Sequence, residues 1–320
     1  MTTENDKTDA ARVCLTFLSE AQNPDGGWGF RPGTPSRVEA TCWPLLALWE
    51  PSRESSEDQV RVHGARDFLH TSQLVDGSWP AAPGEQTGCW VTSLCCLVLT
   101  AIGDQTQSST IESGLRWICE DWPSDSTPWR RFLARLSSQR DVAPINYSYR
   151  GWGWTPGTSS WVEPTSFALL ALERMGGDEL AGKAKRRRAL ATSLLFDRMC
   201  PGGGWNAGNP VVYGAAGEAG IVPTVWALLA LRALPARREI TLSLDWLERA
   251  AGTVESPASA ALARICLRIH GRALPINATG LSELLQNNGF LSDVLVAAWV
   301  TLAFGSDFWL RNSRPGAVAA

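Results

Sequence analysis

The segment FLSEAQNPDGGWGF, residues 17–30, is followed 51 residues later by FLHTSQLVDGSWP, residues 68–80. Both segments carry an aromatic residue and a leucine, then a glutamine, and then a glycine and a tryptophan at the same spacing. The matched positions are Phe17, Leu18, Gln22, Gly26 and Trp28 in the first copy and Phe68, Leu69, Gln73, Gly77 and Trp79 in the second. A third copy at 194–205 has Met199 in the place of the glutamine. Such internal similarity predicts an architecture built from repeated units.

A block rich in Ala, Thr, Ser and Leu follows each glycine- and tryptophan-bearing loop. The blocks are 38–48, 89–99, 162–172 and 222–231, and two weaker ones occur at 256–267 and 295–304. They are apolar nearly all round, which is typical of helices buried on most sides. Amphipathic patterns, such as those at 60–72 and 185–199, precede the loops and predict outer helices.

Six units of outer helix, loop and inner helix predict an all-α fold closed into an (α/α)6 toroid. An open solenoid is the alternative, but solenoid units are usually shorter and more regular than these. We expect one domain over residues 1–320, with a core at about 10–305 and short flexible tails at both ends.

The repeated pattern F-L-x3-Q-x3-G-x-W resembles the QW motif of squalene-hopene and oxidosqualene cyclases, and the similarity covers about residues 10–305. The resemblance implies the (α/α)6 toroid of the terpene cyclase/prenyltransferase superfamily. It also implies that the glutamine amide and the indole link neighbouring outer helices. The segment at 17–30 is therefore expected to be a structural joint, used once per unit.

The resemblance also implies where an acid would lie. Class II terpene cyclases protonate an alkene or an epoxide, which requires a carboxylic acid held protonated in a dry cavity. Their D-x-D-D-T signature falls on residues 37–41 and again on 161–165, with Glu39 and Glu163 at the central position and without the flanking aspartates. Asp293, which opens the last inner-helix block, is the third candidate. The predicted catalytic residues are Glu39, Glu163 and Asp293.

Both glutamates have a structural interpretation as well. Ser36-x-x-Glu39 and Ser160-x-x-Glu163 are each a capping-box pattern, in which the glutamate accepts from a free N–H group at the helix start. A carboxylate at that position also interacts favourably with the helix dipole. The sequence leaves the capping role and the catalytic role open.

Aromatic residues in or beside the inner-helix blocks are candidates for binding an apolar substrate and for stabilising cations through their π faces. They are Trp43, Trp90, Trp161, Phe167, Trp226 and Trp299. We expect only some of them to face the centre. No organic cofactor is implied, and no metal is expected, because the three histidines do not form a set of three or four converging ligands.

The closest activity is therefore protonation-initiated cyclisation of an isoprenoid held in a central apolar cavity. The alternative is a non-catalytic lipid-binding or protein-interaction scaffold that has kept the fold. Whether the chain pairs with a second copy of itself, as a homodimer, or with a second toroid stays open. Triterpene cyclases use two toroids, and the sequence of this chain predicts one.

Composition limits the other classes of partner. A net charge of -3 and a pI near 5.7 argue against nucleic-acid binding, which needs an extended basic face. We interpret the one basic run, 183–188, as a solvated helix start, with binding of a diphosphate or of an anionic membrane surface as the alternative. The polar N-terminus lacks the pattern of a secretory signal. No apolar run reaches the ~18 residues of a membrane span. These features predict a cytoplasmic protein, with peripheral membrane contact as an open alternative.

Overall fold

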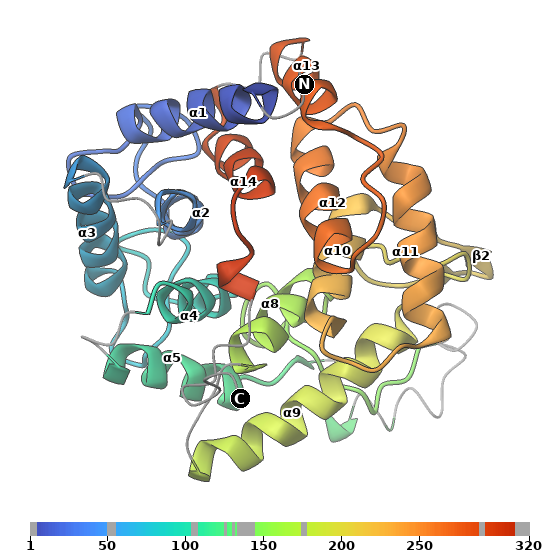
Figure 1. Ribbon diagram of the computed structural model, residues 1–320. Coiled ribbons are helices and arrows are strands. Elements are labelled where there is room, and N and C mark those ends of the chain that lie inside the picture. Colours follow the sequence, from blue (N-terminus) through green and yellow to red (C-terminus); the bar gives the residue numbers. More distant parts are fainter. Residues whose placement is uncertain are drawn as a thin grey trace, which may run out of the picture.

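Twelve α-helices in two concentric layers make up most of the described residues of the computed structural model (Figure 1). The structure describes residues 5–49, 56–103, 108–124, 127–129, 132, 145–173, 178–287 and 292–310. The inner helices are α2 (Val38–Leu48), α4 (Val91–Ala101), α8 (Val162–Glu173), α10 (Ile221–Leu231), α12 (Pro257–Ile269) and α14 (Val294–Phe304). The outer helices are α1 (Asn5–Glu20), α3 (Ser56–Thr71), α5 (Ser108–Glu120), α9 (Asp178–Asp197), α11 (Arg238–Ala251) and α13 (Ala278–Asn287).

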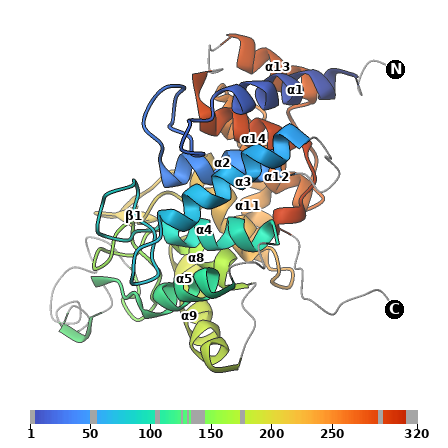
Figure 2. The same cartoon turned by 90° about the vertical axis from the view of Figure 1, so that its left-hand side faces the viewer.

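The inner helices form a closed ring. Each packs against the next in the order given, and α14 returns to pack against α2, while α1 covers α13 and α14. The loop that precedes α10 adds a small hairpin of β1 (Val211–Val212) and β2 (Ala215–Ala216). Figure 2 views the ring from the side, with this hairpin at the left. The predicted all-α toroid is confirmed, and the open solenoid is wrong.

Backbone hydrogen bonds continue around the ring at the loop end. The N–H groups of Val38 and Val162, which begin α2 and α8, donate to carbonyl oxygens of Ala81 and Ala207 in the next unit's loop. The ring closes in the same way, because the Val294 N–H that begins α14 donates to the Phe30 carbonyl of the first loop at 3.1 Å. Each of these helix starts is therefore satisfied by a neighbouring loop.

Four tryptophans form the same joint between an outer helix and its own inner helix. Each indole N–H donates to a carbonyl at or near the end of the outer helix, at 2.5–2.8 Å, and each backbone N–H donates to a threonine hydroxyl of the inner helix. The tryptophans are Trp28, Trp79, Trp152 and Trp205, all away from the ring centre. Their indoles are buried, so the joint is part of the core.

The glutamines make the contact between neighbouring outer helices. The amide of Gln22, after α1, donates to Arg61 O on α3 at 2.9 Å, and that of Gln73, after α3, donates to Thr110 O on α5 at 2.9 Å. Gly26 lies against α3 with a φ of +84°, and an added Cβ would lie 2.3 Å from the Gly64 carbonyl oxygen. The expected link between outer helices is confirmed for the glutamine; the indole instead acts within its own unit.

The joint between α5 and α9 is built differently. Arg187 of α9 is 2 % exposed and lies between the rings of Trp122 and Trp152, at 4.4 and 4.1 Å from their centroids. Burial lowers the pKa of this guanidinium to about 10. The interpretation of 183–188 as a solvated run is therefore wrong for Arg187. The physical reason is that Ala184, Arg187 and Ala191 follow an i, i+3, i+7 pattern along the buried face of α9.

The chain after α14 extends the core beyond its expected limit near residue 305. The short helix η4 (Phe308–Leu310) lies near the centre of the ring in Figure 1, and Trp309 is fully buried. Arg232, which follows α10, donates to Leu310 O and pairs with Glu173 at 2.7 Å. Arg268 of α12 pairs with Asp307. Residues 306–310 therefore cover the end of the ring opposite the loops.

Candidate functional site

The threonine of each joint determines which inner-helix residues face the centre. Successive residues of an α-helix are rotated by about 100°, so the positions two before and two after the threonine both lie opposite to it. The threonine hydroxyl faces the tryptophan loop. The residues at these two positions therefore point into the ring, one helical turn apart.

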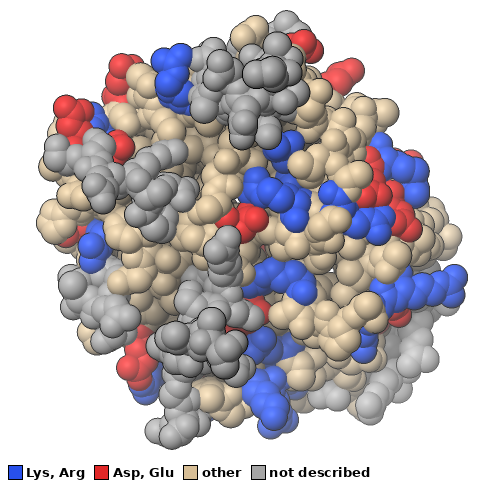
Figure 3. All heavy atoms as spheres, in the orientation of Figure 1, with Lys and Arg blue, Asp and Glu red and all other residues tan. Residues whose placement is uncertain are grey.

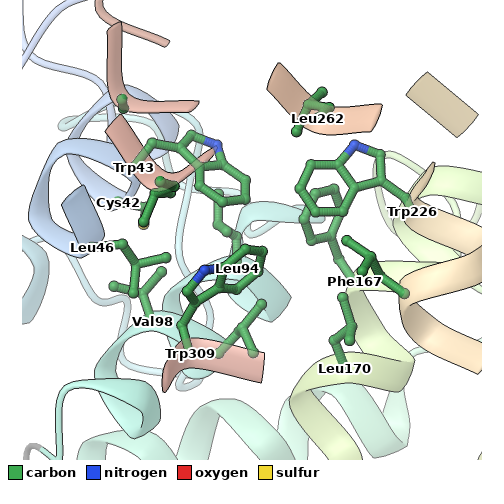
Figure 4. Packing of buried hydrophobic residues seen from close by; sticks show 14 of the residues in the cluster. Cys42, Trp43, Leu46, Leu94, Val98, Phe167, Leu170, Trp226, Leu262 and Trp309 are labelled. Carbon is green, nitrogen blue, oxygen red and sulfur yellow. The ribbon is translucent and has the colours of Figure 1, made fainter. Parts of the chain in front are cut away.

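The position two after the threonine gives a layer of large apolar side chains, which we call the aromatic floor. In α2, α8 and α10 these residues are Trp43, Phe167 and Trp226, and α4 contributes Leu94. Packing brings Leu262 of α12 and Trp299 of α14 to the same layer. Figure 4 shows five of these side chains converging from different helices, together with Trp309.

Ring contacts fill the aromatic floor. The centroids of Trp43 and Trp226, from opposite sides of the ring, lie 5.4 Å apart, and Phe167 lies 4.6 Å from Trp226. Trp309 is edge-on to Trp43 at 6.0 Å and closes the layer from the η4 side. The aromatic floor is therefore packed across the centre of the ring.

The position two before the threonine gives a layer at the loop end, which we call the acidic layer. It contains Glu39 of α2, Trp90 before α4 and Glu163 of α8, all partly buried. These residues lie four positions before Trp43, Leu94 and Phe167, about 6 Å higher along the ring axis. The acidic layer therefore lies above the aromatic floor, on the loop side of the ring.

The acids of this layer influence one another. Burial, and then the negative charges of Glu163 and Asp293, raise the pKa of Glu39 from 4.5 to about 7. Burial also raises the pKa of Glu163. The charges of Glu163 and Asp293 therefore act on Glu39, although the three predicted acids come from helices far apart in the sequence. Glu39 can thus carry a proton near neutral pH.

The three acids differ in their hydrogen bonding. Asp293 is the N-cap of α14 and accepts from the backbone N–H groups of Leu295 and Val296 at 2.9 and 3.1 Å. At α2 the capping-box interpretation is wrong, because no side chain caps the helix. Ser36 instead donates to Asp25, and the first N–H of α2 donates to Ala81 O. The capping role thus belongs to Asp293, and Glu39 is left to face the centre.

The predicted aromatic residues divide into three groups. Trp43, Phe167, Trp226 and Trp299 belong to the aromatic floor, with Trp43 and Trp299 5.8 Å apart. Trp90 lies in the acidic layer, 5.1 Å from Phe167. Trp161 is 37 % exposed and lies against Gly208 of the next loop, where the missing side chain leaves room for the indole, so it does not face the centre.

Two central aromatic residues were missed by the sequence reasoning. Trp154 meets Trp90 edge-on at 5.3 Å and comes from the loop before α8. Trp309 follows the last repeat, where periodicity gives no signal; only the apolar triplet Phe308–Leu310 indicates a buried turn.

The η4 end is closed by charged contacts. Figure 3 shows Lys and Arg side chains around the centre of the face seen in Figure 1.

Within the ranges described, no group of three or more His, Cys, Asp or Glu side chains could hold a metal ion. Among the same residues, no helix is long and apolar enough to cross a membrane. The eight cysteines are buried free thiols.

Comparison with known proteins finds one similar sequence among curated proteins. No family model matches the chain. It is 26% identical over 235 residues to a drimenyl diphosphate synthase from Streptomyces showdoensis, over 62% of this chain and 42% of that protein. The chain therefore spans less than half of the length of this curated relative.

The solved structures show the fold. The type II terpene cyclase MstE from Scytonema, in complex with geranylgeranyl dihydroxybenzoate, superposes with a TM-score of 0.58 at 14% identity, covering 93% of this chain and 98% of that chain. An α-1,6-mannanase of Salegentibacter sp. gives 0.59 at 10% identity, with coverage of 93% and 98%. The chain is thus similar in sequence to a drimenyl diphosphate synthase, and it shares its fold with a type II terpene cyclase and with a mannanase.

Proposed function

We propose that this protein binds an isoprenoid at the loop end of the toroid and initiates its cyclisation by protonation from Glu39. The observation that carries the proposal is the position of Glu39, a carboxyl group with a pKa raised to about 7 and one helical turn above Trp43 and the rest of the aromatic floor. An acid beside π faces suits a reaction in which a proton is added to an alkene and a carbocation results.

The proposed chemistry is an isomerisation. The Glu39 O–H bond breaks as the π electrons of an alkene form a C–H bond, which leaves a carbocation on the neighbouring carbon. A second alkene of the same chain closes a ring onto that carbon. Loss of a proton to an ionised carboxylate, Glu163 or Glu39 itself, then forms a new alkene, so atoms and charge balance. The faces of Trp43, Phe167 and Trp226 stabilise the cations.

The filled floor limits how the ligand is held. Because Trp43 and Trp226 contact each other across the ring, the reacting end of the chain lies between the two layers and the remainder extends toward the loops. Exposed apolar side chains lie on those loops: Phe30, Trp161 and Tyr213. We include in the proposal a peripheral membrane contact at this rim, which co-sedimentation with lipid vesicles tests. A homodimer or second-toroid partner stays an untested prediction.

The fold is compatible with a glycosidase as well, since the mannanase superposes equally well. A sugar needs many hydrogen-bond donors and acceptors, whereas the floor here consists of indole, phenyl and leucine side chains. This composition favours the isoprenoid. A non-catalytic scaffold is the second candidate, and the filled centre is the observation that favours it.

Incubation with C15–C30 isoprenoids and mass spectrometry of products and bound lipid tests the proposal. Wild type, Glu39→Gln and Glu163→Gln are compared. We expect turnover to collapse in Glu39→Gln while the affinity for the apolar ligand persists, because glutamine keeps the shape and removes the proton source. Full turnover in both variants removes these residues as the acid. Ligand binding without any product in wild type favours the scaffold.

A further inference from the structure

The charge of the acidic layer bears on which isoprenoids can enter it. Glu39 and Glu163 lie in this layer, two residues before the threonines of α2 and α8, and Asp293 begins α14 beside the first loop. The negative charges of Glu163 and Asp293 both act on Glu39. The six inner helices begin at or near this end, and their N-termini favour negative charge. At α14 that preference is met by Asp293, which accepts from two N–H groups, and the first N–H groups of α2 and α8 donate to loop carbonyl oxygens.

A diphosphate placed here adds two or three negative charges next to this set. Repulsion between like charges a few ångströms apart in a partly buried site is strong enough to change an affinity by more than tenfold. Arg37, the N-cap residue of α2, pairs with Glu85 at 3.7 Å, so its charge is partly balanced by that carboxylate. A prenyl diphosphate therefore meets net repulsion from the described residues of the acidic layer.

The aromatic floor supplies an independent observation. The indole N–H groups of Trp43 and Trp299 are buried and have no hydrogen-bond partner in the structure. Both rings belong to the centre, 5.8 Å apart. A buried N–H without an acceptor is unfavourable, and a pure hydrocarbon leaves it so. A hydroxyl or carbonyl oxygen on the ligand accepts such a bond without adding charge.

We propose that the site is selective for an uncharged isoprenoid that bears a hydroxyl or carbonyl oxygen and that it discriminates against prenyl diphosphates. The inference rests on the proposed isoprenoid binding and specifies its substrate class. The oxygen lies at the inner end, within reach of an indole N–H, and the hydrocarbon extends toward the loops.

Equilibrium binding of farnesol and of farnesyl diphosphate to the full chain tests this inference. The two ligands share one hydrocarbon and differ only in the head group. We expect farnesol to bind at least about tenfold more tightly at pH 8. The ratio is expected to be smaller at pH 6, where more of Glu39 is protonated and the diphosphate carries less charge. A ratio below tenfold at pH 8 overturns the inference and leaves isoprenoid binding in place.

Substitutions test whether the negative charges of the site cause the difference in affinity between the two ligands. Glu163→Gln and Asp293→Asn each remove one negative charge and are expected to lower the ratio, whereas Glu112→Gln on the outer helix α5 removes one exposed charge and leaves it unchanged. Glutamine at 163 preserves the shape of the side chain, so this variant remains informative if Asp293→Asn does not fold. An unchanged ratio in Glu163→Gln overturns the electrostatic cause. If neither ligand binds to wild type, the proposed function fails together with this inference.

Discussion

Between pH 5 and pH 8, wild type should lose more unfolding free energy than the Glu39→Gln variant. The reason is the cost of holding an ionised carboxylate in the acidic layer. Burial and the charges of Glu163 and Asp293 raise the pKa of Glu39 from 4.5 to about 7, so the folded state binds this proton more tightly than the unfolded state. Stability from this group is therefore present at low pH and is lost as the pH rises from about 4.5 to 7.

The size of the effect follows from the two pKa values. One pH unit of difference corresponds to about 1.4 kcal/mol, so the difference between 4.5 and 7 sets a limit of about 3.4 kcal/mol. Integration of the proton linkage between pH 5 and pH 8 gives about 2.5 kcal/mol. Wild type loses this amount through Glu39 across the interval, and Glu39→Gln does not.

Urea unfolding of both proteins at pH 5, 6.5 and 8 measures the effect. The comparison across pH cancels the constant difference between burying a neutral acid and burying an amide. Glu112→Gln, an exposed carboxylate on α5, is the matched control and should show no such trend. If the stability difference between Glu39→Gln and wild type is the same at pH 5 and pH 8, Glu39 is fully hydrated and the reasoning about the acid is wrong.

Three further predictions concern the fold. Trp28→Ala is expected to cost about 3–5 kcal/mol of stability with unchanged ligand preference, checked by thermal melts and binding assays; an unchanged melting temperature with lost binding would contradict the joint. Gly26→Ala should prevent or severely weaken folding, whereas Gly33→Ala, also at positive φ but with nothing within 4 Å, should cost only about 1–2 kcal/mol by urea unfolding. Arg232→Leu should cost about 3–5 kcal/mol because Glu173 stays buried and unpaired, and the double variant with Glu173→Leu should recover most of this loss; an equal loss in both would refute the ion-pair argument.

The repeat made the fold predictable. Each intact copy contains a glutamine that links two outer helices and a glycine at a turn where a side chain does not fit. Gln22 and Gln73 reach the next outer helix, and Gly26 lies against that helix where a side chain does not fit. The residues of each copy are local in sequence and recur at fixed spacing, although the contacts that the glutamines make join positions 39 and 37 residues apart. The pattern alone therefore predicted the ring of paired helices, without any information on long-range packing.

Features outside the repeat were not predictable in this way. Trp309 enters the centre from a segment with no periodic partner. Its place depends on Arg232, which links Leu310 to Glu173 of α8, and on the pair between Asp307 and Arg268 of α12. Arg187 was hidden in a basic run, where charge masked its position on a buried face. Trp161 matched the composition of a central residue, but it precedes the helix and its indole turns toward Gly208.

The position of the candidate acid follows from the structural joint. Thr41 accepts the Trp28 N–H at 3.0 Å and donates to Arg37 O at 2.8 Å, which fixes the rotation of α2 about its axis. A rotation of about 100° per residue then directs residues 39 and 43 to the ring centre. The same bond to Thr165 does this for residues 163 and 167. A carboxyl group two residues before this threonine thus lies above an aromatic side chain two residues after it. The joint that holds the toroid together therefore also positions the acid, and it does so without the flanking aspartates.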